Sequence, residues 1–66
     1  MTPTIPTPAE IRAAREAAGL TQTAAGEIVY KRLRTWQQYE SGEAAIDPAV
    51  WELWRIKTRR KRAMAR

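Results

Sequence analysis

Two polar side chains, four residues apart, could bind the same partner. Arg34 and Gln38 lie in the stretch 33–40, which the apolar pattern predicts to be a helix, and residues four apart share one helix face. A guanidinium group can pair with guanine through two hydrogen bonds, and a carboxamide can do the same with adenine. Ser41 falls on this face too, while the core side of the helix holds Leu33, Trp36, Tyr39 and Glu40. The spacing therefore indicates a helix with one face free to read bases.

A shorter helix directly before this stretch would position it. Thr21 is a good N-cap for a helix from Gln22 to about Val29, because its hydroxyl can accept a backbone N–H at the helix start. Gly42 predicts the end of the second helix, since glycine adopts the left-handed cap without strain. Small residues in the first helix allow the two helices to cross closely, namely Ala24, Ala25 and Gly26. Two short helices joined by a tight turn are typical of DNA-binding elements.

Two further helices are predicted, one on each side of this pair. Thr7, Pro8 and Glu10 combine an N-cap, a proline at the first helical position and the acid of a capping box, and Gly19 marks the end of that helix. Asp47 caps the last helix, whose inward stripe is predicted to comprise Val50, Leu53 and Trp54. The fold is therefore expected to be all-α.

The composition excludes several classes of protein. With neither Cys nor His, no thiolate or histidine metal site and no nucleophile–base pair can form, so we expect no enzyme, no catalytic residue, no metal and no cofactor. No apolar run approaches the roughly 18 residues of a membrane span, which predicts a soluble, cytoplasmic protein with no membrane partner. Its 66 residues predict one domain at 7–56, after a disordered, proline-containing lead at 1–6 and before a basic tail or helix extension at 57–66.

The positive charge is concentrated at one end of the chain. The net charge is +5, but residues 57–66 hold six basic residues and no acidic one, which leaves residues 1–56 with a net charge of −1. Such a tail attracts polyanions without regard to their sequence. A second local excess of cations lies at the start of the reading helix, at Lys31, Arg32 and Arg34. Together they favour a nucleic acid as the partner.

The order of residues from Leu20 to Gly42 resembles the Cro and repressor family of phage proteins, the XRE-like transcription regulators. The resemblance is carried by Leu20, Thr21, Gln22, Gly26, Val29, Trp36, Tyr39, Glu40 and Gly42. It extends over about 11–56 and implies a compact, lambda-repressor-like bundle of four to five helices that contains a helix-turn-helix. The runs LRTWQQ and WELW look like those of very short phage-borne regulators, including autorepressors that accompany anti-CRISPR genes.

The resemblance and the charge pattern together predict the candidate site residues. By the resemblance, base edges would be reached by Arg34 and Gln38, with Gln37 and Thr35 beside them, and Gln22 would contact a phosphate. The other residues expected to contact DNA phosphates are Thr23, Lys31, Arg32, Ser41, Arg59 and Arg60, the last two as part of the basic tail. A structural ion pair between Arg15 and Glu40 would tie the first helix to the reading helix, and such a pair is costly to break.

Three residues at the turn depart from the family pattern. Tyr30 stands where glycine is favoured, so a bulky residue would have to take a positive φ, or the turn would be rearranged. Lys31 stands where an apolar residue is usual, and Leu33 is expected to turn inward in its place. Arg32 replaces the usual Ser or Thr N-cap, which forfeits about 0.5–2 kcal/mol of capping but adds a cation beside the phosphates.

The resulting expectation is a repressor of its own operon that binds double-stranded DNA. A symmetric homodimer would read an inverted repeat, with the dimer interface on the last helix at Trp51, Trp54 and Ile56. Two other classes fit the sequence. An antitoxin would bind a toxin as well as its own promoter, and an RNA-binding module would use the arginine-rich end.

Overall fold

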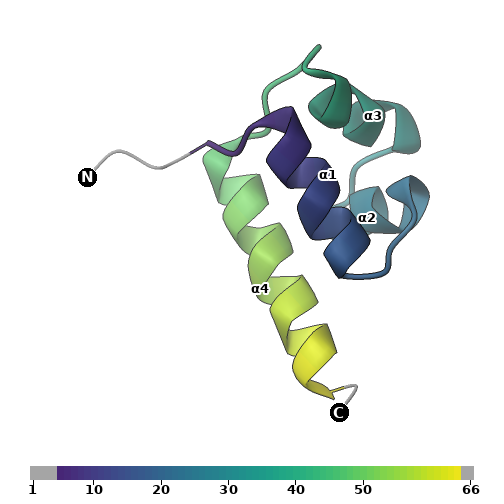
Figure 1. Ribbon diagram of the computed structural model, residues 1–66, viewed down its shortest axis with the longest axis vertical. Coiled ribbons are helices and arrows are strands. Elements are labelled where there is room, and N and C mark those ends of the chain that lie inside the picture. Colours follow the sequence, from purple (N-terminus) through teal and green to yellow (C-terminus); the bar gives the residue numbers. More distant parts are fainter. Residues whose placement is uncertain (1–4, 65–66) are drawn as a thin grey trace.

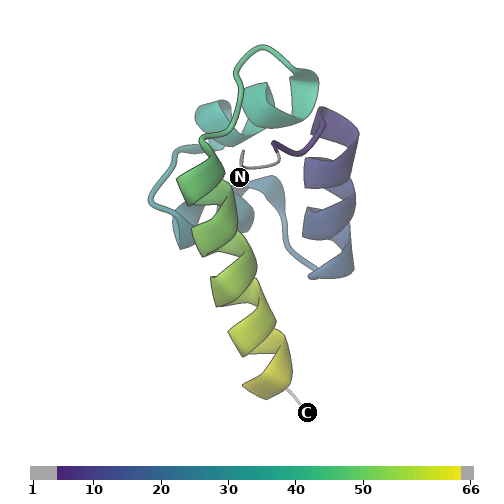
Figure 2. The ribbon, with the colours of Figure 1, turned by 90° about the vertical axis from the view of Figure 1, so that its left-hand side faces the viewer.

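Four α-helices make up the part of the chain that the structure describes. The structure is a computed structural model that describes the backbone of residues 5–64 and the side chains of residues 5–59. In chain order the helices are α1 (Pro8–Ala17), α2 (Gln22–Ile28), α3 (Leu33–Ser41) and α4 (Pro48–Met64). Residues 5–64 contain no strand, so the expected all-helical fold is confirmed, with four helices and no fifth. Figures 1 and 2 show α1, α2 and α3 gathered together, with α4 extending past them at the end away from α3.

The two ends of the chain are described only in part. Of the predicted lead at 1–6, only Ile5 and Pro6 lie among the described residues, and neither is helical. The predicted basic extension begins inside α4, which continues to Met64. None of the helices described here has the length and apolar character needed to cross a membrane.

Side-chain caps set the helix starts where the sequence predicts them. The Thr7 hydroxyl accepts the Glu10 N–H at 3.1 Å, and the Glu10 carboxylate accepts the Thr7 N–H at 2.7 Å, which completes the capping box. Thr21 accepts the Ala24 N–H at 3.1 Å at the start of α2. Gly42 ends α3 in the left-handed conformation, with φ 89°. Local hydrogen bonding therefore explains most of the helix boundaries.

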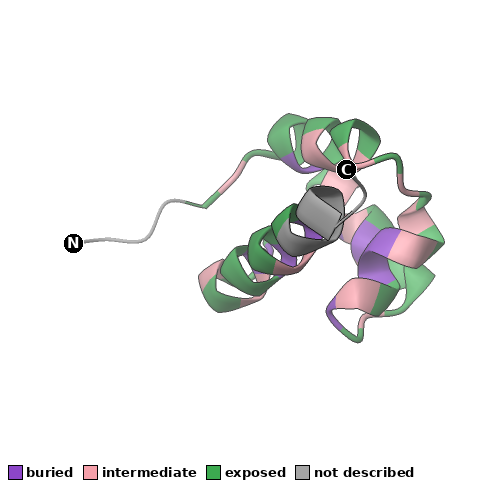
Figure 3. Ribbon diagram, turned by 90° about the horizontal axis from the view of Figure 1, so that it is seen from below, coloured by how far each residue is buried: buried purple, intermediate pink, exposed green. Residues whose placement is uncertain are grey.

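The core is built around three tryptophans. The Trp54 ring lies between Trp36, 5.5 Å away, and Trp51, which stacks on it at 5.4 Å with an interplanar angle of 5°. The Trp54 indole N–H donates to the Ala25 carbonyl at 3.1 Å, so its one polar atom is satisfied and α4 is joined to α2. Figure 3 shows buried positions on the inner sides of the helices. The remaining buried apolar residues are Ile11, Ala25, Val29, Tyr39 and Ile46.

Two leucines expected in the core are exposed. Leu33 does not turn inward to replace an apolar residue at position 31, since 41% of its surface is accessible. Leu53 is 39% accessible, although it was expected on the inward stripe of α4. Trp51 lies inside instead, because the stack on Trp54 rotates α4 so that residues 51, 54 and 58 face the core. In both cases the helix was predicted correctly, but the side of the helix that faces the core was not.

Gly26 is required by the turn and not by a crossing helix. A Cβ at this position would lie 2.8 Å from the Lys31 carbonyl oxygen and 3.5 Å from that of Arg32. The backbone is held there because the Lys31 N–H donates to the Gly26 carbonyl at 2.8 Å. At Gly26, the close approach is therefore between α2 and the chain that leads into α3.

Gly26→Ala is expected to lower the free energy of unfolding by about 1–2 kcal/mol. The clash with the Lys31 carbonyl should cost about 2–3 kcal/mol, because a backbone atom would have to move, offset in part by the roughly 1 kcal/mol that alanine gains in helix propensity. Urea unfolding followed by circular dichroism would measure the change. Glu27→Ala, an exposed substitution in the same helix, is the control and should have little effect. A Gly26→Ala protein as stable as the parent would show that the turn can move away without cost.

Candidate nucleic-acid interface

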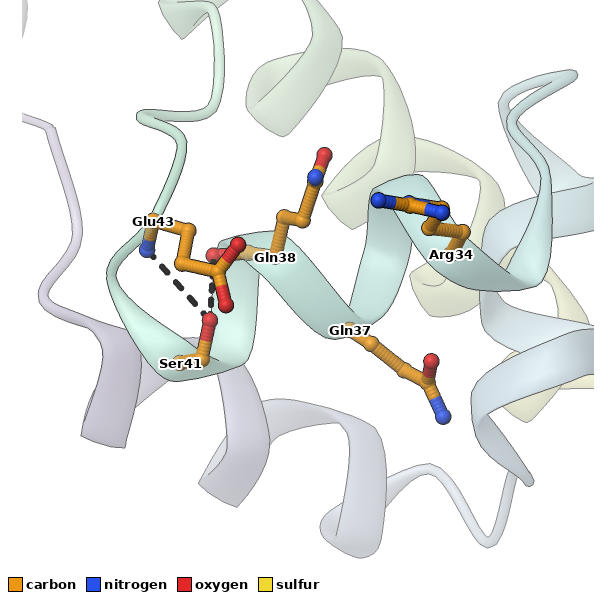
Figure 4. Close-up of a pocket in the computed structure, with 5 residues that line it drawn as sticks. All are labelled: Arg34, Gln37, Gln38, Ser41 and Glu43. Carbon is orange, nitrogen blue, oxygen red and sulfur yellow. Dashed lines mark hydrogen bonds between the residues drawn. The ribbon is translucent and has the colours of Figure 1, made fainter.

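One side of α3 presents a row of polar side chains around a shallow hollow. The hollow is lined by Arg34, Gln37, Gln38, Ser41 and Glu43. Arg34 and Gln38 extend from the same side of the helix, as the helical period predicts (Figure 4). Arg34 is exposed and Gln38 is half-buried. The structure therefore brings together the two side chains that the sequence singles out for base reading.

The opposite side of α3 fixes this row in place. Trp36 is fully buried and Tyr39 is 6% exposed, and their rings meet edge to face at 5.8 Å. Both are anchored in a core that α1, α2 and α4 share. Because Trp36 and Tyr39 are packed on the side of α3 opposite Arg34 and Gln38, they resist rotation of the helix about its axis. Arg34 and Gln38 therefore project in a fixed direction.

Glu40 is the polar centre of the packing between α1, α2 and α3. Its carboxylate accepts hydrogen bonds from Arg15 at 2.6 and 3.3 Å, from the Trp36 indole N–H at 2.6 Å and from the Gln22 amide at 3.1 Å. Burial favours the neutral acid, but these donors together outweigh it and lower the pKa of Glu40. Arg15 also donates to the Leu20 carbonyl at 2.9 Å. The ion pair implied by the family resemblance is present, as a member of a larger network.

Gln22 and Gln37 are engaged with the protein itself. The Gln22 amide nitrogen donates to Glu40, and its carbonyl oxygen accepts a 3.4 Å hydrogen bond from Gln37. Figure 4 shows Gln37 pointing away from Arg34 and Gln38. A phosphate contact by Gln22 would therefore replace one of these bonds, and Gln37 is turned away from Arg34 and Gln38.

The other expected contact residues are spread over three places. Thr35 is half-buried in the first turn of α3, and Thr23 is exposed at the start of α2. Arg32 is the N-cap of α3 but makes no side-chain capping bond, as expected of an arginine there. Arg59 is exposed on α4, whose C-terminal turns project away from α3 (Figure 1). Arg60 is in α4 too, but its side chain lies outside the described ones.

The turn between α2 and α3 adopts the strained alternative that the sequence raises. Tyr30 has φ 62°, a left-handed conformation that is unfavourable for a bulky residue. Lys57 secures it, since its ammonium lies 4.5 Å from the centre of the Tyr30 ring and donates to the Ile28 carbonyl at 2.9 Å. In the sequence, Lys57 stands out only as one charge of the basic tail. Nothing in its sequence neighbourhood signals a contact with residues almost thirty positions earlier.

The expected dimer interface is not an exposed surface in this structure. Trp54 is 1% exposed and Trp51 is 9% exposed, so both rings are already buried within one chain. Trp54 packs on Trp36 in the core, which agrees with its predicted place on the inward stripe, and Trp51 stacks on Trp54. The expected dimer contact through these two rings is therefore wrong for this structure, because neither offers an exposed face. Ile56 is 45% exposed.

Comparison with known proteins identified no relative of this chain. No protein-family model matches the chain, and no curated protein matches it significantly.

Proposed function

We propose that this protein binds double-stranded DNA in a sequence-specific manner and regulates transcription, as a helix-turn-helix repressor of its own operon. The observation that carries the proposal is the position of Arg34 and Gln38. They line the hollow on the outer side of α3, opposite the buried Trp36 and Tyr39. A major groove of about 12 Å admits one α-helix, and α3 would be that helix.

The chemistry of this row suits base edges. The Arg34 guanidinium can donate two hydrogen bonds to guanine, and the Gln38 amide can donate to and accept from adenine. Trp36, Tyr39 and the hydrogen bonds of Glu40 hold α3 in place in the free protein. This preorganisation supports selective binding, because less ordering is needed when DNA binds. The +5 net charge supplies attraction to any duplex, so selectivity must come from the row and not from the charge.

Two copies of the protein would read an inverted repeat. One short helix contacts only a few base pairs, and a symmetric pair doubles that length with half-sites about 34–36 Å apart. Among the described side chains of α4, the large apolar ones that are exposed are Leu53 and Ile56, which lie three positions apart and therefore on one helix face. In this proposal they take the place of the buried tryptophans at the contact between copies.

Arg34→Ala and Gln38→Ala should each weaken binding to the selected site by about 1–3 kcal/mol and leave the fold intact. The site would first be obtained by selection from randomised duplexes, and affinities would then be measured at one fixed salt concentration. Arg12→Ala removes the same charge from an exposed position on α1 and serves as the control. Full affinity and unchanged base preference in both α3 variants would contradict the proposal. A stronger affinity for RNA than for duplex DNA of equal length would contradict it as well.

A further inference from the structure

An acidic side chain closes one end of the hollow along α3. Glu43 lies two positions beyond the helix and lines the hollow together with Arg34 and Gln38. Gly42 brings it there, because its left-handed conformation turns the chain back at the end of the helix. Figure 4 shows Glu43 beside Ser41, and Ser41 is the last residue of α3.

Ser41 fixes the position of Glu43. Its hydroxyl donates to the Gln38 carbonyl at 3.2 Å and accepts the Glu43 N–H at 3.3 Å. This side chain, expected to contact a phosphate, thus has its donor and one acceptor position used within the protein. It connects the backbone of residue 43 to the helix that carries Arg34 and Gln38.

The Glu43 carboxylate faces solvent and takes part in no ion pair among the side chains that the structure describes; those pairs are Arg12–Glu16 and Arg15–Glu40. A carboxylate opposite a phosphate would weaken binding to every duplex. Opposite a base edge it has a favourable use, since Asp and Glu accept the N4 amino group of cytosine. The rise of an α-helix puts residue 41 roughly 10 Å from residue 34 along the axis of α3, so Glu43 and Arg34 lie at opposite ends of the hollow and would contact different bases.

We infer that Glu43 is a specificity-determining residue that accepts a hydrogen bond from cytosine N4, at the end of the site read by Arg34 and Gln38. Ser41 is its positioning residue. The inference rests on the proposed function and extends it by one base.

Selection from randomised duplexes with the parent protein, Glu43→Ala and Arg34→Ala tests this assignment. The parent should select cytosine at one outer position, and Glu43→Ala, which has no acceptor, should lose that preference alone, with affinity for the parent's site about 5- to 150-fold lower. Arg34→Ala should change a different position. Ser41→Ala should weaken the cytosine preference, and Ser41→Thr, which keeps the hydroxyl, should retain it.

Two results would overturn the inference. In the first, Glu43→Ala binds all duplexes more tightly by the same factor, with a steeper salt dependence, which would mean that the parent's carboxylate faces a phosphate. In the second, Glu43→Ala selects the same bases as the parent. Both leave the proposed function standing, provided that the parent selects a site and Arg34→Ala alters it. A parent protein that selects no bases at all would refute the proposed function itself.

Discussion

Glu40→Ala is expected to lower the free energy of unfolding by about 3–5 kcal/mol, the cost of removing one partner from a buried ion pair. The Glu40 side chain is 7% exposed and that of Arg15 is 14% exposed, so the guanidinium would remain largely buried without its carboxylate. The substitution also leaves the Trp36 indole N–H and the Gln22 amide without their acceptor. Chemical unfolding followed by circular dichroism would measure the loss.

Glu16→Ala is the matched control for this prediction. It removes the same side chain from the Arg12–Glu16 pair, whose side chains are 66% and 57% exposed. Solvent-exposed pairs four residues apart on a helix contribute only about 0.2–0.5 kcal/mol. Equal losses in Glu16→Ala and Glu40→Ala would show that burial of the second pair has no energetic consequence.

The hydrogen-bond network of Glu40 makes the free energy of unfolding depend on pH. Folding lowers the pKa of Glu40 below its ordinary value of 4.5, so its contribution is complete above that pH and is lost as the pH falls through the lowered pKa. Glu40→Gln, which cannot ionise, should lack this part of the acid-induced loss. Unfolding free energies measured from roughly pH 3 to pH 7 would compare the two proteins. Parallel curves would mean that Glu40 does not titrate differently on folding.

Trp54→Ala is expected to cost about 3–5 kcal/mol, the usual effect of truncating a buried tryptophan. The ring is 1% exposed and touches Trp36 on one side and Trp51 on the other, so its removal leaves a cavity in the middle of the stack. Domains of this size have a free energy of unfolding of only about 3–10 kcal/mol, so the variant should lose a large part of its stability and unfold at a much lower temperature than the parent. Thermal unfolding monitored by circular dichroism is the measurement.

Trp54→Phe separates packing from hydrogen bonding. Phenylalanine keeps most of the ring but leaves the Ala25 carbonyl without its donor, which should cost about 1–3 kcal/mol. Trp51→Ala, at the outer end of the stack, should be less damaging than Trp54→Ala. A larger loss in Trp51→Ala than in Trp54→Ala would place the centre of the core elsewhere.

The sequence predicts helix boundaries well because those boundaries depend on local chemistry. Thr7, Thr21 and Gly42 act within a few residues of themselves, and each acts as expected. The relative positions of Arg34 and Gln38 follow from the helical period alone, so the sequence predicts that they share a face.

Features that depend on the direction of the core were harder to predict. The helical period gives angles between residues but not the side on which the other helices pack, so Leu33 and Leu53 were predicted inside and Trp51 at a contact between two copies. A contact distant in sequence, such as that of Lys57 with the Ile28 carbonyl, leaves no local pattern. Gly42 predicts the end of α3 but not the path of the chain after it, so the place of Glu43 beside the hollow could not be predicted.

The hydrogen bonds from α4 to α2 have a consequence for the order of events during protein synthesis. Trp54 donates to the Ala25 carbonyl and Lys57 to the Ile28 carbonyl, and Lys57 also covers Tyr30 in its strained turn. The ribosome makes α2 and α3 before it makes either donor. A nascent chain that ends before α4 therefore lacks the groups that hold the turn, and we expect α3 to reach its final orientation only after α4 has emerged.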